Sequence, residues 1–156
     1  MSVELVRTYL KNWDLEDRIR EFDVSSATVE LAAEAVGCEP ARIAKTMSFL
    51  VDGKAVLIVL AGDVKIDNRK FKDQFHTKAA MVKPEQLEEL VGHPMGGVCP
   101  FAVKETVEVY LDDSLKRFET VYPAAGSPRS AVKLNLKELE QASGSKGWID
   151  VSKMRE

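Results

Sequence analysis

Apolar residues return every three or four positions in several stretches of this chain, which is the spacing of one face of an α-helix. The first stretch predicts a helix from residue 3 to about 13, with Val6 and Leu10 on its inner face. Thr28 and Gly37 are typical of a helix start and a helix end, so residues 28–36 predict a second one. Further helices are predicted at 68–75 and from 84 to about 90. A capping box predicts another from 135 to about 142, and Pro40 predicts the start of a short helix that carries Ile43.

A second pattern, short apolar runs separated by turn residues, predicts strands. Asp52-Gly53 stands between the apolar runs 46–51 and 54–61 and predicts a tight hairpin. The second run is apolar on both faces, so we expect it to be central in a sheet and covered on both sides. Further strands are predicted at 19–22, 78–82, 107–111, 119–122 and 131–134, with an edge strand around 148–149.

The mixture of strands and helices defines the expected fold class. The 156 residues show no internal repeat, linker or low-complexity run. We therefore expect one α+β (mixed α/β) domain over residues 1–156. Many short strands favour a curved, barrel-like mixed sheet surrounded by helices.

Composition and charge exclude several classes of protein. The formal net charge of −3 argues against a protein that wraps duplex DNA, but not against one that grips the end of an RNA. Two cysteines, Cys38 and Cys99, are too few for a disulfide scaffold, and no Cys/His cluster predicts a zinc site. The N-terminus lacks the features of a signal peptide, and the longest apolar run, 55–61, is too short to span a bilayer. We expect a cytoplasmic protein without a DNA or membrane partner.

The segment richest in chemical information is Gly96-Gly97-Val98-Cys99-Pro100-Phe101. Adjacent glycines let the backbone approach a ligand closely, and proline stiffens the following turn. Such a bend can offer N–H donors to a carbonyl oxygen that becomes an oxyanion, although a plain turn between strands explains the same residues. Lys45 is the second candidate, because a lysine at the start of an apolar strand either reaches past the sheet to solvent or holds a ligand group as a fixed charge.

Several separate motifs between about residues 28 and 139 occur in a characteristic order. They are Ile43-Ala44-Lys45-Thr46, Ala61-Gly62-Asp63, the segment 96–101, Asp112-Asp113-Ser114-Leu115 and Ala125-Gly126-Ser127-Pro128. This order resembles the YbaK/ProX/EbsC family, free-standing relatives of the editing domain of bacterial prolyl-tRNA synthetase. The resemblance implies a mixed α/β fold around a barrel-like sheet, and an enzyme that hydrolyses the ester between a wrong amino acid and its tRNA.

The resemblance also implies the residues of the site. The family's lysine falls on Lys45, and its GxxxP loop, which positions the substrate carbonyl and the terminal ribose, falls on Gly96 and Pro100. For Asp112, an alternative is a turn in which the carboxylate bonds its own backbone. The implied catalytic residues are Lys45, Gly96, Gly97 and Pro100, and the implied substrate-binding residues are Thr46, Val98, Asp112, Gly126 and Ser127.

For the chemistry we expect positioning and carbonyl polarisation, with attack by water helped by the substrate's own vicinal hydroxyl or side chain. No metal or organic cofactor is implied. The expected substrate is mischarged tRNA(Pro), and prolyl-tRNA synthetase is a candidate partner. Alanine, serine, threonine and cysteine stay open as the amino acid removed. Residues 130–133 lack the aspartate of the cysteinyl-tRNA branch, which argues against cysteine.

Two other functions remain as alternatives. The first is a non-catalytic module that holds an aminoacyl or nucleotide ligand in the same pocket. The second is a thiol hydrolase in which Cys99 is the nucleophile and His93 or His76 the base. A small buried cysteine is the plainer interpretation of Cys99.

A cluster of basic residues stands out in this acidic chain: Lys65, Arg69, Lys70, Lys72 and Lys78. Most such runs are solvated faces. Here Lys65, Arg69, Lys70 and Lys72 are candidates to bind phosphates of the tRNA acceptor end, in contacts that salt would weaken.

Overall fold

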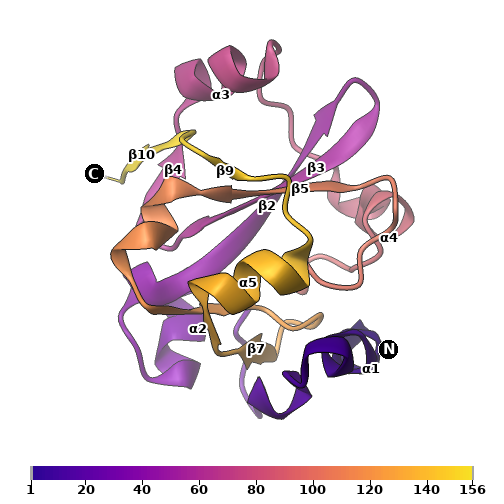
Figure 1. Cartoon of the computed structure of the whole chain (residues 1–156), viewed down its shortest axis with the longest axis vertical. Coiled ribbons are helices and arrows are strands. Elements are labelled where there is room, and N and C mark those ends of the chain that lie inside the picture. Colours follow the sequence, from indigo (N-terminus) through magenta and orange to yellow (C-terminus); the bar gives the residue numbers. More distant parts are fainter. Residues whose placement is uncertain (1, 156) are drawn as a thin grey trace.

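The main sheet has six strands in the order β8-β6-β2-β3-β5-β9 (Figure 1), in a computed structural model that describes residues 2–155. The strands are β2 (Ile43–Val51), β3 (Lys54–Ala61), β5 (Glu108–Asp112), β6 (Thr120–Pro123), β8 (Leu134–Asn135) and β9 (Trp148–Ile149). Pairing is antiparallel for β2–β3 and β6–β8, and parallel for β2–β6, β3–β5 and β5–β9. The sheet is mixed and curled, so the predicted fold class is confirmed.

Two antiparallel ribbons form separate two-stranded sheets beside the main one. One joins β1 (Ile19–Glu21) to β7 (Ser130–Val132), and the other joins β4 (Val64–Ile66) to β10 (Ser152–Met154). The sequence predicted β1 and β7 but neither β4 nor β10, because each is a three-residue strand without an apolar run of its own.

Two helices begin where the capping signals placed them, after Thr28 and Asn135, whereas the predicted helices 3–13 and 84–90 each consist partly of a 3₁₀ turn. The helices are α1 (Ser2–Leu10), α2 (Val29–Val36), α3 (Asn68–Phe75), α4 (Leu87–Leu90) and α5 (Leu136–Ser143), with 3₁₀ turns at Lys11–Trp13, Glu16–Arg18, Pro40–Arg42, Pro84–Gln86 and Asp113–Arg117. Thr28 Oγ1 accepts from Leu31 N at 3.2 Å, and Asn135 and Glu138 form the predicted capping box. In residues 2–155 no helix is long and apolar enough to cross a membrane.

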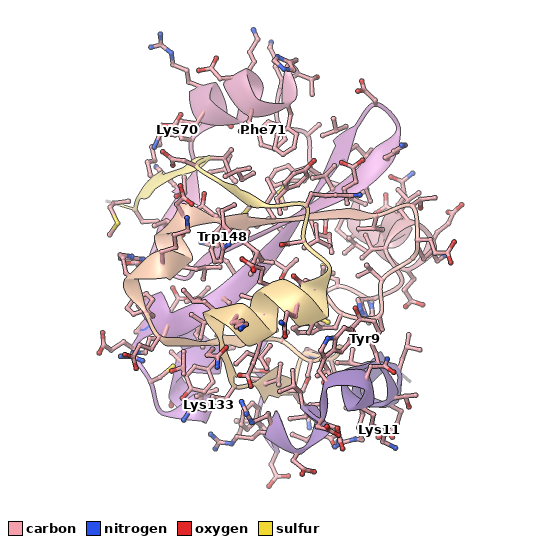
Figure 2. The ribbon with its side chains drawn as sticks, in the orientation of Figure 1. Tyr9, Lys11, Lys70, Phe71, Lys133 and Trp148 are labelled. Atoms are coloured by element: carbon pink, nitrogen blue, oxygen red, sulfur yellow. The ribbon has the colours of Figure 1, made fainter. Side chains whose placement is uncertain are left out.

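The core is built around β3, as its two-sided apolar pattern predicted. Residues 55–61 are at most 4% exposed, with β2 on one side and β5 on the other. Phe71 of α3 points toward the sheet and packs on Phe49 of β2, with 4.9 Å between ring centroids (Figure 2). Tyr9 of α1 donates from its hydroxyl to Ala142 O of α5 at 2.6 Å, which joins the two ends of the chain.

Three sequence predictions of local structure were wrong in detail. Residues 78–82 run beside β2 but form only one bridge, Met81 to Phe49, so they are not a strand. Ile43 begins β2 and does not belong to the short helix before it. The predicted strand 131–134 is divided at Lys133 into β7 and β8, because its first half pairs with β1 and its second with β6.

Candidate functional site

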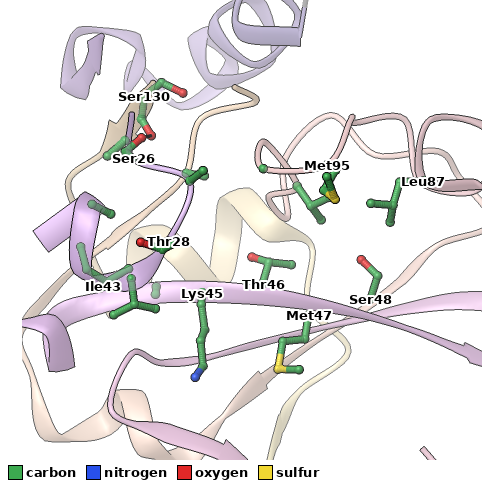
Figure 3. A pocket seen from close by; sticks show the side chains of 18 of the residues that line it. Ser26, Thr28, Ile43, Lys45, Thr46, Met47, Ser48, Leu87, Met95 and Ser130 are labelled. Atoms are coloured by element: carbon green, nitrogen blue, oxygen red, sulfur yellow. Dashed lines mark hydrogen bonds between the residues drawn. The ribbon is translucent and has the colours of Figure 1, made fainter. Parts of the chain in front are cut away.

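A cavity of about 420 Å³ lies beside β2, between the N-terminal end of α2 and the loop that contains Gly96 (Figure 3). Its wall is mostly apolar. The aliphatic hydroxyls in the wall belong to Ser26, Thr28, Thr46, Ser48 and Ser130, and Lys45 is its charged residue. An apolar cavity with a few placed polar groups is the usual form of a small-ligand site.

Strand alternation divides the β2 residues between two faces. Thr46 and Ser48 project toward the Met95 side, whereas Lys45 and Met47 project the other way (Figure 3). Within residues 2–155 the buried Oγ1 of Thr46 has no hydrogen-bond partner. Leaving a buried hydroxyl unpaired costs free energy, so this atom is a natural contact for a bound ligand.

The ammonium group of Lys45 is already engaged. Its Nζ donates to Val64 O of β4, on the face of β2 opposite Thr46. Burial lowers the pKa of Lys45, as does the nearby charge of Arg155, while Asp63 and Glu30 raise it. Lys45 is therefore part of the cavity wall, but its ammonium lies on the opposite face of β2, against β4, whose residues do not line the cavity.

The glycine loop has the tight geometry that its sequence predicted. The N–H of Gly97 donates to Pro94 O at 3.1 Å, and Gly96 has a φ of +87°, which closes a turn that favours glycine. A Cβ on Gly97 would lie 2.6 Å from Gly126 O and 2.8 Å from the Cα of Ser127. The two glycine-rich segments, distant in sequence, are thus packed backbone to backbone.

The structure shows which backbone N–H groups of this loop are free to donate a hydrogen bond to a ligand. Gly97 is excluded, because its N–H is used inside the turn. The N–H groups of Gly96 and Val98 have no acceptor in the described part of the chain, and both residues line the cavity. These two groups are the candidate donors to a substrate oxygen.

Gly126 and Ser127 lie behind the loop and contact its Gly97, and none of the three lines the cavity. The Ser127 hydroxyl donates to Ser130 Oγ at 3.0 Å, and Pro100 is buried at the far end of the loop. Their contribution is to fix the shape of the wall. The substrate-binding roles that the resemblance implied for Gly126 and Ser127 stay predictions.

Cys99 does not have the surroundings of a nucleophile. It is 0% exposed and does not line the cavity, and burial raises the pKa of its thiol to about 12. His93 Nε2 lies 3.5 Å from its Sγ, but that nitrogen carries the proton donated to Phe101 O at 2.6 Å. A protonated nitrogen cannot take the thiol proton, so His93 cannot act as the base for Cys99. The bond to Phe101 O stabilises the loop instead, and the geometry argues against a thiol hydrolase.

Asp112 is placed away from the cavity, which corrects its implied position in the pocket. Its carboxylate is 0% exposed and accepts from Ser114 N (2.9 Å), Val151 N (2.9 Å) and the Ser152 hydroxyl (2.7 Å). The first bond is the turn-type alternative considered from sequence. The other two tie the C-terminal segment to β5.

The predicted basic cluster is assembled from β4 and α3. Lys65 lies on β4, and Arg69, Lys70 and Lys72 lie on α3. Lys70 is not free for RNA, because its Nζ donates to Ser152 O (2.8 Å) and to Asp150 Oδ1 (3.1 Å). Lys65, Arg69 and Lys72 are exposed.

Sequence reasoning missed part of the cavity wall. Ser48 could have been found, since it follows Thr46 at the i+2 spacing of one strand face. Met81 and Met95 are 58% and 67% exposed at the wall, and no local signal marks them. Ser26 reaches the cavity only because Pro128 O and Ser130 O hold it there.

Residues 24–142 match the profile of the aminoacyl-tRNA editing domain, so the chain belongs to this family and the resemblance noted in its sequence is confirmed. Uncharacterized protein YwhH of Bacillus subtilis (strain 168) is 53% identical over 154 residues, 98% of each chain. Proline–tRNA ligase of Bacillus cytotoxicus is 26% identical over 113 residues, which are 71% of this chain and 20% of the ligase. The chain thus spans about a fifth of that relative.

Solved structures agree with this assignment. A protein proposed to be a trans-editing enzyme for prolyl-tRNA synthetase superposes with a TM-score of 0.88 at 28% identity, over 97% of each chain. The hypothetical protein APE2540 superposes with a TM-score of 0.84 at 25% identity, over 96% of this chain and 99% of its own.

Proposed function

We propose that this protein hydrolyses the ester of mischarged aminoacyl-tRNA, acting in trans, with tRNA(Pro) as the expected tRNA and prolyl-tRNA synthetase as a candidate partner. The observation that carries the proposal is a set of unpaired polar groups that belong to residues lining one cavity. The Gly96 and Val98 N–H groups and the Thr46 hydroxyl have no protein partner in residues 2–155, in a family defined by aminoacyl-tRNA editing. The whole chain would act as one editing domain.

The roles follow from the geometry. The N–H groups of Gly96 and Val98 polarise the ester carbonyl as its oxygen gains charge, and the Thr46 hydroxyl orients the aminoacyl group. Water attacks with help from the vicinal ribose hydroxyl. Direct attack by water needs no covalent intermediate, and Cys99, buried behind the loop, is not accessible to form one.

Lys45 takes a binding role on the other face of β2. An ammonium has three N–H donors, and the bond to Val64 O uses one. Because the group lies across β2 from Thr46, we assign the remaining donors to the phosphate or ribose of the terminal nucleotide.

The test is release of labelled amino acid from alanyl-, seryl-, threonyl- and cysteinyl-tRNA(Pro) at enzyme concentrations far below that of the substrate. Turnover on at least one of them supports the proposal. Tight stoichiometric binding without turnover would instead establish the non-catalytic module.

Two variants sharpen this test. Thr46→Val keeps the shape and removes the unpaired hydroxyl, so it should lower kcat/KM by about 2- to 12-fold without loss of stability. Lys45→Ala should lower it by about 10- to 150-fold, the value of a charged hydrogen bond. Lys54→Ala, an exposed lysine at the hairpin, is the matched control. Full activity of both Thr46→Val and Lys45→Ala would discard these roles.

A further inference from the structure

Two lysines face each other across the ribbon of β4 and β10. The antiparallel register places Lys65 directly opposite Lys153, and both are exposed on the outer face of the ribbon. Like charges in directly opposed positions destabilise a strand pair. The Lys65–Lys153 pair therefore costs stability, which indicates that the positive charge serves another purpose.

The carboxylates near this pair are committed elsewhere. Asp67 caps α3 by accepting from Arg69 N and Lys70 N at 3.0 and 3.1 Å. Asp63 accepts from Arg117 at 2.6 and 2.9 Å, and Asp150 accepts from Lys70 at 3.1 Å. Within the described residues no carboxylate lies within 4 Å of the Lys65 or Lys153 ammonium. In a chain of net charge −3, Lys65 and Lys153 thus form positive surface without a direct ion pair among the described residues.

The ribbon is also hydrogen-bonded to a residue of the candidate site. Val64, the residue before Lys65, is the one whose carbonyl accepts from Lys45. Arg155 follows β10, donates from its backbone to Asp63 O at 3.1 Å, and lies close enough to Lys45 to lower its pKa. Figure 1 shows β4 and β10 together on the side of the molecule that carries α3. Positive groups therefore extend from the β4 face of β2, where the Lys45 ammonium lies, along the ribbon toward α3.

We propose that the ribbon of β4 and β10 is an RNA-binding surface, on which Lys65 and Lys153 bind backbone phosphates of the acceptor end whose terminal nucleotide reaches Lys45. The identity of the RNA rests on the proposed function, but binding to the ribbon does not depend on catalysis. Lys153 lies beyond residues 24–142, the part that matches the family profile, so the C-terminal strand would supply half of this surface. Phosphate contacts of this kind carry no sequence information and orient the nucleic acid.

Charge reversal distinguishes an effect on RNA binding from a loss of stability, because it should weaken binding while raising the Tm. Lys65→Glu should weaken binding of uncharged tRNA about tenfold at low salt and reduce the slope of log K against log salt by about 0.7–0.9. The same variant turns a repulsive cross-strand pair into an attractive one, so its Tm should rise by roughly 1–4 °C. Lys153→Glu should weaken binding equally but gain less stability, because Lys153 also attracts Asp67.

The double variant Lys65→Glu/Lys153→Glu completes the design. Its pair is again like-charged, so the gain in Tm should vanish while RNA binding weakens further. Lys11→Glu is the matched control, since it makes the same change of net charge at an exposed lysine far from Lys70 and α3 (Figure 2). Binding is measured by fluorescence anisotropy with uncharged tRNA(Pro), and by the KM and kcat of deacylation.

Each outcome has a definite meaning. A rise in KM with little change in kcat for Lys65→Glu, absent from Lys11→Glu, supports the ribbon. Equal loss of binding in Lys11→Glu, or no loss in the double variant, overturns it. If the wild-type protein binds tRNA through the ribbon but deacylates no mischarged tRNA, the proposed function fails and the RNA-binding surface stands.

Discussion

At the scale of single residues, Gly97 decides the shape of the candidate site, because there is no room for a side chain. A Cβ there would lie 2.6 Å from Gly126 O, a backbone atom that cannot turn aside. Gly97→Ala should therefore push the two loops apart and cost about 1–3 kcal/mol in the free energy of unfolding. Deacylation should fall with it, since Gly96 and Val98 move with the loop.

The measurement for Gly97→Ala is urea unfolding followed by circular dichroism, beside the deacylation assay. Gly144→Asn is the control, because Gly144 has a φ of +61° with open space around it, and asparagine tolerates that conformation. Wild-type stability and activity in Gly97→Ala would contradict the packing described.

A second residue-scale prediction concerns the charge around Lys45. Arg155→Gln removes a neighbouring positive charge and should raise the pKa of Lys45. Glu30→Gln removes a negative charge and should lower that pKa. Nuclear magnetic resonance titration of the lysine ε-methylene signals measures both, with the Lys45 signal assigned by its loss in Lys45→Ala. Shifts of the same sign in the two variants would refute the arrangement.

Four residues that the sequence motifs singled out, Lys45, Thr46, Gly96 and Val98, line one cavity, while their roles stay predictions. Sequence alone could not give the direction of the Lys45 ammonium, which depends on the carbonyl of Val64 in another strand. Likewise, only the folded structure shows that the buried hydroxyl of Thr46 has no hydrogen-bond partner among the described residues. Motifs locate a site, whereas hydrogen-bond partners distant in sequence define what each residue can do.

At the scale of elements, Asp112 joins the C-terminal segment to the central sheet. It accepts two hydrogen bonds from Val151 and Ser152, next to β9 and β10. Asp112→Ala leaves those buried donors unsatisfied and should cost about 2–4 kcal/mol in the free energy of unfolding. Faster hydrogen exchange should appear in β10 and in its partner β4. Asp113→Ala is the matched control. Among residues 2–155 the ion pair of Asp113 is with Lys116 at the exposed surface, so its loss should cost under about 0.5 kcal/mol. Equal losses in the two variants would count against this role.

Helix positions were predictable from sequence, since Thr28 and Asn135 signal their helix starts within three residues. The hairpin was equally local: Asp52 and Gly53 both adopt positive φ, 53° and 81°. The β4–β10 ribbon was not predictable. Its two short strands come from distant parts of the chain, and only the folded protein brings them together.

At the scale of the whole molecule, the candidate site exists only in the complete fold. The cavity takes its wall from α2, β2, the 95–98 loop and the segment around Ser130. Cys99 lies behind that wall at 0% exposure, so its thiol is accessible only when the structure opens. It is therefore a chemical probe of global unfolding, as well as a test of the thiol-hydrolase alternative.

Because burial raises its pKa to about 12, Cys99 carries thiolate in only about one molecule in 10⁴ at pH 8. Cys38 is half-buried, and burial raises its pKa as well, but iodoacetamide can still reach it. In Cys38→Ser protein we expect no loss of deacylation during prolonged alkylation under native conditions. Mass spectrometry should find Cys99 modified only as urea populates the unfolded state, at a rate that follows the unfolding curve. Rapid inactivation of Cys38→Ser protein without denaturant would make Cys99 a reactive thiol and reopen nucleophilic catalysis.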